Sequence, residues 1–128
     1  MKVLLDTHIV LWYLDDHPKL TAQAKDMIED QSNEVWISIV SLWEMAIKSS
    51  LGKLELADDL GVIESTLHRQ GIQTLPIAVT HLRCLSTLPF HHRDPFDRLL
   101  VAQSIEEQMT LLTEDQQLSA YPSIFFTQ

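Results

Sequence analysis

The sequence lacks several residue patterns on which whole classes of site depend. It has a single cysteine, Cys84, which excludes an internal disulfide and a cysteine-rich zinc site. Its three glycines form neither G-x-G-x-x-G nor G-x-x-x-x-G-K-[ST], and none of them comes directly after the first apolar segment. No G-x-S-x-G is present either. These absences argue against dinucleotide-dependent oxidoreductases, P-loop nucleotide hydrolases and serine hydrolases that carry their nucleophile on a tight turn.

Long apolar runs are also missing. No run approaches the ~18 residues that cross a bilayer, so no membrane association is expected. The N-terminal apolar stretch is interrupted by Asp6 and His8 and lacks a small-residue cleavage site, so no signal peptide is predicted. Together with the single cysteine, these features favour a reducing, cytoplasmic setting.

Basic residues are scarce. Nine lysines and arginines stand against 18 aspartates and glutamates, which gives a net charge of -9. This balance argues against a broad basic surface that grips nucleic acid, because such binding depends on neutralising phosphates. It is compatible with an enzyme that reaches phosphates through bound metal cations, and with a partner that carries a basic segment. An acidic surface that aids solubility explains the charge equally well.

What the sequence does contain is an alternation of strand-like and helix-like segments over 128 residues, a length that predicts a single domain, 1–128. Strands are expected at 2–6, 34–38, 72–76, 109–115 and 123–127. Helices are expected at 7–14, 21–31, 38–50, 58–69, 78–86 and 95–108. This alternation predicts parallel βαβ units and an α/β fold in which helices cover both faces of a mainly parallel sheet.

Acidic residues end two of the expected strands. Parallel sheets place their sites beyond the carboxyl ends of the strands, which is where Asp6 and Asp115 fall. Glu114 precedes Asp115, and the sequence leaves open which of the two faces inward. Each acid also has a structural interpretation, because Asp6 or Thr7 suits the start of the next helix and Asp115 suits a turn.

Glu44 is a carboxylate in the apolar segment IVSLWEMAI. In one interpretation it shares a solvated helical stripe with Ser41 and Lys48, forming an i, i+4 ion pair with the lysine. In the other it faces the crevice at the strand ends. The segment alone slightly favours the solvated stripe.

Asp94 and Asp97 stand at the predicted start of the 95–108 helix. Asp94 precedes Pro95, as expected of an N-cap, because proline is favoured at the first helical position. Asp97 then falls at the third helical position, where its negative charge also favours the helix dipole. The Asp97 side chain is further expected to face the carboxyl ends of the strands.

The topology would bring Asp6, Glu44, Asp97 and Asp115 into one crevice. Each close pair of bare carboxylates would repel by roughly 3 to 4 kcal/mol at an effective dielectric constant near 20. Protonation or bound cations must relieve this repulsion. Mg²⁺ or Mn²⁺ suits oxygen ligands, and either ion can activate water and hold the oxygens of a phosphodiester.

Four stretches carry a resemblance to a known family: VLLDTHIVLWYL, ISIVSLWEMAIKSSLGKL, HHRDPFDRLLVAQS and LLTEDQQLSAY. In this order they resemble PIN-domain proteins, specifically VapC-type toxin ribonucleases of toxin–antitoxin pairs. The resemblance implies a three-layer α/β/α sandwich, metal-dependent cleavage of RNA, inhibition by a cognate antitoxin and frequent homodimerisation. It places the acidic cluster of the family on Asp6, Glu44, Asp97 and Asp115, with flanking hydroxyls at Thr7 and Thr113. Asp94 matches a subgroup motif and is expected to support the site from outside the cluster.

Basic and aromatic side chains near these motifs have two interpretations each. Arg93 and Arg98 can hold a phosphate through paired hydrogen bonds, or they can pair with the neighbouring aspartates. His91 and His92 can approach RNA, but solvated loop histidines are the more common case. The three tryptophans, at 12, 36 and 43, lie in apolar segments, where core packing explains them better than base stacking.

Two other functions remain open on the sequence. The first is a non-catalytic PIN-like interaction module, against which the presence of all four acids counts. The second is a receiver-like Mg²⁺-binding signalling domain. A receiver would show an acidic pair at the first strand and a lysine after a late strand, whereas this chain has LLDTH and LLTEDQQ.

Overall fold

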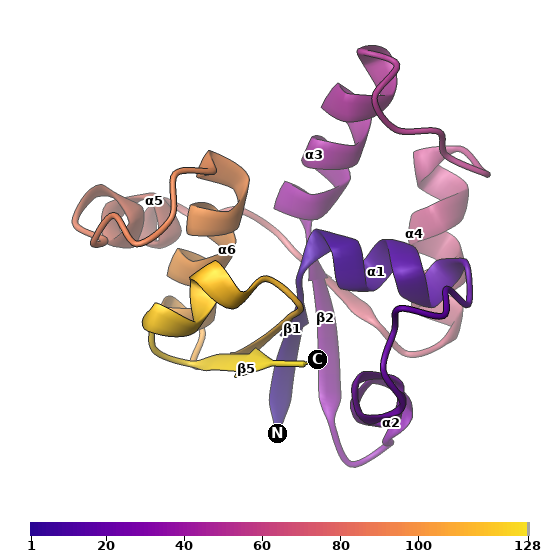
Figure 1. The fold of residues 1–128 in the computed structure, drawn as a ribbon, viewed down its shortest axis with the longest axis horizontal. Helices are drawn as coiled ribbons and strands as arrows, with labels where there is room; N and C mark the ends of the chain where they lie inside the picture. The colour runs from indigo at the N-terminus through magenta and orange to yellow at the C-terminus, as the bar shows by residue number, and fades with distance from the viewer. Residues whose placement is uncertain (128) are drawn as a thin grey trace.

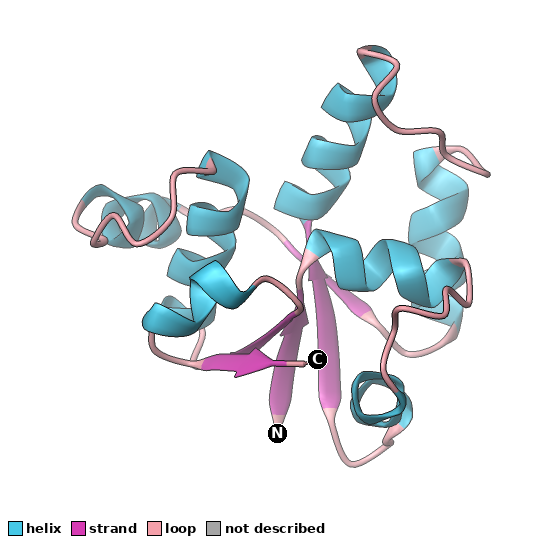
Figure 2. Ribbon diagram, in the orientation of Figure 1, coloured by secondary structure: helices cyan, strands magenta, loops and turns pink. Residues whose placement is uncertain are grey.

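The computed structural model describes residues 1–127, in which one all-parallel sheet has the strand order β3-β2-β1-β4-β5. Figure 2 shows the strands at the centre with helices on either side. The first half of the chain forms β1 (Lys2–Leu5), α1 (Thr7–Leu14), α2 (Ala22–Glu29), β2 (Glu34–Ser38), α3 (Ile39–Ser50) and α4 (Leu60–Arg69). The second half forms β3 (Gln73–Leu75), α5 (Val79–Ser86), α6 (Pro95–Glu106), β4 (Thr110–Thr113), the 3-10 helix η1 (Gln116–Ala120) and β5 (Ile124–Phe126). The expected three-layer α/β/α fold with a parallel sheet is confirmed.

The sheet has a buried face on each side because successive side chains of a strand point to opposite faces. Val3 and Leu5 of β1 pack with α1, α2 and α4, whereas Leu4 packs with α6 and η1. In Figure 1 α1, α2 and α4 lie to one side of the sheet, and α5, α6 and η1 lie to the other. Strands with two buried faces are near-continuous apolar runs, which is how they are recognised in this sequence.

Helix α3 differs from the others because it contributes to both cores. Val40 belongs to the cluster under α6, and Met45 belongs to the cluster under α1. In Figure 1 it rises from the end of β2 between the two helical layers. This position brings the middle of α3 next to the carboxyl ends of the strands.

The element boundaries agree with the sequence within a few residues, and the differences have local causes. Strand β4 ends at Thr113 because Asp115 already caps η1, its side chain accepting from the Gln117 N–H. Helix α1 is capped by Asp6, so Thr7 is its first helical residue. Among the described residues, no helix is long and apolar enough to span a membrane.

Candidate active site

Asp6 directly follows β1, the central strand, and so lies at the carboxyl ends of the parallel strands. Its backbone N–H donates to the carbonyl of Leu112 in β4 at 3.0 Å, and its side chain is buried. Oδ1 accepts from the Thr7 N–H at 2.7 Å, and Oδ2 accepts from Thr113 Oγ1 at 2.6 Å. Thr113 Oγ1 in turn accepts from the Asp115 N–H at 3.0 Å. A fully buried hydroxyl therefore links the first acid to the last.

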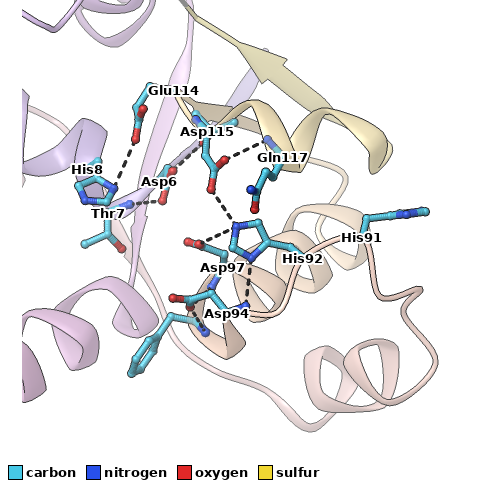
Figure 3. Close-up of polar contacts among 12 residues, drawn as sticks. Asp6, Thr7, His8, His91, His92, Asp94, Asp97, Glu114, Asp115 and Gln117 are labelled. Atoms are coloured by element: carbon cyan, nitrogen blue, oxygen red, sulfur yellow. Dashed lines mark hydrogen bonds and ion pairs between the residues drawn. The ribbon is translucent and has the colours of Figure 1, made fainter.

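Glu114 and Asp115 occupy different places beyond β4. Glu114 Oε1 lies 3.4 Å from His8 Nδ1, and the ligand atoms of these two residues and Asp6 lie within 4.8 Å of one another. Asp115 Oδ2 accepts from His92 Nε2 at 2.9 Å, on the side of the site that Asp97 occupies. Figure 3 shows Glu114 directed toward His8 and Asp115 directed toward His92, with Asp6 between them. The sequence posed Glu114 and Asp115 as alternatives, but both carboxylates border the site.

The start of α6 supplies two aspartates, each in a different role. Asp94 Oδ1 accepts from the N–H groups of Phe96 and Asp97, so Asp94 is the N-cap that the sequence predicts. Asp97 lies in the first turn of α6. Only 17% of its side chain is exposed, and its Oδ2 lies 3.6 Å from His92 Nε2. The ligand atoms of His92, Asp97 and Asp115 all fall within 4.8 Å of one another.

Glu44 completes the set from α3, and the solvated-stripe interpretation of this helix is wrong. Ser41 and Glu44 are both buried, and Ser41 Oγ accepts from Thr7 Oγ1 at 2.8 Å. The expected pair with Lys48 is present, with Nζ 2.6 Å from Glu44 Oε2. The other carboxylate oxygen, Oε1, is buried without a hydrogen-bond partner among the described residues.

The electrostatics connect these groups. Burial, together with the charges of Asp6, Asp94, Glu44 and Asp115, raises the pKa of Asp97 to about 8. Burial also raises the pKa of Asp6, and the opposing effects of the Thr113 hydrogen bond and of His8 leave that pKa at about 6. Every other acid of the predicted cluster therefore raises the pKa of Asp97. The basic groups around the site do not fully neutralise its negative charge.

The sequence profile of the PIN domain matches residues 3–123, which is almost the whole chain.

The chain belongs to the PIN domain family.

Among characterised relatives, this PIN domain is similar to ribonuclease VapC22 of Mycobacterium tuberculosis. The two are 29% identical over 123 residues, covering 93% of this chain and 91% of the relative. The fold resembles VapBC2 from Rickettsia felis bound to a promoter DNA fragment, with a TM-score of 0.71, 16% identity and coverage of 99% and 98% of the two chains. It also resembles a toxin–antitoxin complex from Klebsiella pneumoniae, with a TM-score of 0.66, 14% identity and coverage of 96% and 95%.

The residues of this PIN domain fit a hard divalent cation. Mg²⁺ and Mn²⁺ bind carboxylate oxygens, which converge here from β1, α3, α6 and the end of β4. The partnerless Oε1 of Glu44 and the raised pKa of Asp97 both indicate missing positive charge. A cation among these groups would favour their ionised forms and satisfy buried oxygens.

For Arg98 the pairing with a neighbouring aspartate is wrong, and for His92 the solvated-loop interpretation is wrong. Arg98 pairs with no aspartate in the described structure, since Nη2 donates to the Leu88 carbonyl at 2.8 Å and the guanidinium lies 3.9 Å from the centre of the Phe90 ring. Arg93 is exposed. His92, expected as a solvated loop residue, is instead 89% buried between Asp97 and Asp115, with 11% of its side chain exposed. Its only sequence signal was its place two residues before Asp94.

Of the three tryptophans, one departs from the expectation of core packing. Trp43, next to Glu44 on α3, is 48% exposed and meets Phe96 edge to face at 4.8 Å between ring centres. Trp12 and Trp36 are partly buried against the two cores, as the sequence indicates. An exposed tryptophan that contacts a partly buried phenylalanine therefore lies beside Glu44.

Proposed function

We propose that this PIN domain is a metal-dependent endoribonuclease that hydrolyses RNA phosphodiester bonds with Mg²⁺ or Mn²⁺. The observation that carries the proposal is the convergence of buried and partly buried carboxyl groups around Asp97, whose pKa of about 8 reflects burial and four neighbouring acids. A cluster of carboxylates repels the phosphates of RNA, and a bound divalent cation would supply the positive charge that attracts them. The similarity to a relative named as a ribonuclease supports RNA as the substrate class.

The roles follow from the contacts. Asp6, Asp97 and Asp115 would ligate the metal, and Glu44 would ligate it directly or through water. When bound, the metal supplies positive charge for the phosphate and lowers the pKa of a water molecule. Glu44 Oε1, which has no protein partner in the described structure, would accept a hydrogen bond from that water and orient it. Thr113 would hold the Asp6 carboxylate in place through its hydrogen bond to Oδ2.

Supporting groups surround this set. Thr7 links α1 to Ser41 of α3 and so fixes the distance between the helices that carry Asp6 and Glu44. Asp94 fixes the first turn of α6 on which Asp97 lies. Exposed Arg93 is available to an RNA phosphate, and Arg98 would contribute through its hold on the 88–90 segment.

We further propose that the chain is the toxin of a toxin–antitoxin pair, acts in the cytoplasm where RNA is available, and forms a homodimer. Its net charge of -9 suits an antitoxin with a basic segment. The structural neighbours include toxin–antitoxin complexes, which support a protein partner. Exposed apolar side chains on α3 and α5, among them Trp43 at 48% and Val79 at 71%, support association between chains.

The direct test is incubation of purified protein with structured RNAs in Mn²⁺ or Mg²⁺, then with chelator. Wild-type protein should cleave only with metal, and Asp6→Asn should lose cleavage while keeping its circular dichroism spectrum. Asp58→Asn, an exposed aspartate outside the site, is the matched control and should cleave normally. Chelator-insensitive cleavage would overturn the proposal. Antitoxin binding without cleavage of any RNA would identify a non-catalytic interaction module instead.

A further inference from the structure

His92 is held by the protein on both sides of its ring. Nε2 lies 2.9 Å from Asp115 Oδ2 and 3.6 Å from Asp97 Oδ2, and Nδ1 accepts a hydrogen bond from the Asp94 N–H at 3.0 Å. Figure 3 shows the ring between the three aspartates, whereas the neighbouring His91 points away from them. The placement is specific to His92 and is not shared by the adjacent loop histidine.

The loop that carries His92 is anchored independently of the acids. The N–H groups of His91 and His92 both donate to Tyr121 Oη, at 2.9 and 3.2 Å, and this hydroxyl donates to the Pro89 carbonyl at 2.5 Å. Tyr121 is itself buried in the core below α6. The backbone around His92 is thus fixed by a side chain of the core, independently of the aspartates that the ring contacts.

The hydrogen bonds determine which nitrogen carries the proton. A backbone N–H can only donate, so Nδ1, its acceptor, must present a lone pair. The hydrogen of a neutral imidazole then lies on Nε2, where Asp115 accepts it. A nitrogen that carries hydrogen has no lone pair for a metal, so His92 cannot be a ligand while Asp94 donates to Nδ1.

We propose that His92 is a positioning residue, which donates from Nε2 to Asp115 and orients the Asp97–Asp115 pair for a divalent cation without binding that cation itself. This inference rests on the metal-dependent activity proposed above. Hydrogen bonds that orient ligating carboxylates increase metal affinity because the ligands need not be ordered when the ion binds. Here Tyr121 fixes the loop that carries His92, and His92 in turn orients the carboxylate of Asp115.

The first experiment is ¹H–¹⁵N long-range spectroscopy of the histidine rings, in metal-free protein and in saturating Mg²⁺. His92 should show its hydrogen on Nε2 in both conditions. A change to an Nδ1-bound hydrogen when Mg²⁺ is added would make His92 a ligand and would overturn the proposal. So would a metal-free spectrum with the hydrogen already on Nδ1.

The second experiment measures Mn²⁺ affinity from the electron paramagnetic resonance signal of the free ion. His92→Gln places an amide donor near the position of Nε2 and should keep Mn²⁺ affinity within about threefold. His92→Asn places its amide near the position of Nδ1, keeps an acceptor for the Asp94 N–H and loses reach to Asp115. It should weaken binding by about 10- to 100-fold. Tyr121→Phe, which removes the loop anchor, should weaken binding by a smaller factor.

His91→Asn is the matched control, because the side chain of His91 is exposed. It should bind Mn²⁺ as the wild type does. Equal affinity in His92→Asn and wild type, with both folded by circular dichroism, would overturn the proposal. Wild-type protein that binds Mn²⁺ with the expected variant pattern but cleaves no RNA would support the role of His92 and overturn only the ribonuclease function. Wild-type protein that binds neither Mg²⁺ nor Mn²⁺ would overturn both.

Discussion

The Oγ1 hydroxyl of Thr113 donates a buried hydrogen bond of 2.6 Å to Oδ2 of Asp6, although 107 residues separate them in the chain. The same oxygen accepts from the Asp115 N–H at 3.0 Å. The direction of the Thr113 proton is therefore fixed, because the backbone N–H occupies its acceptor side. One hydroxyl at the end of β4 thus orders the first and last acids of the candidate site.

Thr113→Val should reduce both stability and cleavage. Valine preserves the shape of the side chain but leaves Asp6 Oδ2 and the Asp115 N–H without this partner, at a cost of about 1 to 3 kcal/mol in the free energy of unfolding. Loss of the hydrogen bond, which lowers the Asp6 pKa, should move that pKa further above about 6. Metal-dependent cleavage near pH 7 should fall at least about tenfold, with recovery at higher pH. Thr113→Ser is the control and should remain close to wild type in thermal denaturation and in initial rates.

Asp97→Asn should abolish cleavage yet stabilise the metal-free protein. The Asp97 pKa is about 8 in the folded protein and near 3.8 in the unfolded chain. Between these values the folded state binds more protons than the unfolded state, so this group's contribution to stability falls as pH rises and is fully lost above about pH 8. The melting temperature of Asp97→Asn should therefore exceed that of wild type by roughly 5 °C at pH 8 in chelator.

The pH dependence separates this electrostatic effect from a change in packing. The difference in melting temperature between Asp97→Asn and wild type should shrink progressively as the pH is lowered from 8 to 4 in metal-free buffer. A difference that is constant across this range would contradict the raised pKa. Asp58→Asn should show no comparable pH-dependent difference, because Asp58 is exposed.

Divalent metal should stabilise the fold most where the acids are ionised. The addition of Mn²⁺ at 100 times its dissociation constant should raise the free energy of unfolding by about 2.7 kcal/mol at pH 8. The gain should be smaller at pH 5, because protons and metal compete for Asp6 and Asp97. Asp6→Asn should lose most of the gain in differential scanning calorimetry. An equal gain in this variant would show that the ion binds elsewhere.

Lys48 should neutralise the buried charge of Glu44 within α3. Lys48→Met leaves Glu44 buried without its 2.6 Å partner and should destabilise the metal-free protein by about 1 to 3 kcal/mol. Mn²⁺ should reduce this loss, because the cation replaces the missing positive charge. The double variant Lys48→Met, Glu44→Gln should be less destabilised than the sum of its parts in urea denaturation. Simple additivity would contradict the coupling.

Local signals in the sequence were sufficient for much of the fold. The apolar run ending at Asp6 predicted β1, and Asp94 with Pro95 predicted the start of α6, because strand burial and helix capping are short-range effects. The alternation of such elements predicted the parallel sheet, since parallel strands require crossover connections. The grouping of Asp6, Asp97 and Asp115 near one sheet edge followed from that topology, and their role as metal ligands stays a prediction.

The orientation of Glu44 and the position of His92 were decided by the tertiary structure. Helix α3 packs against both cores, so its polar stripe of Ser41 and Glu44 faces neighbouring helices where a surface helix would face water. No periodicity along one helix reports what packs against it. The loop that carries His92 is held by Tyr121, 29 residues further along the chain.

The sequence by itself determined which segments become strands and helices, because those preferences act within a few residues. Only the folded chain decided which polar groups lose their water, because desolvation depends on segments that meet after folding.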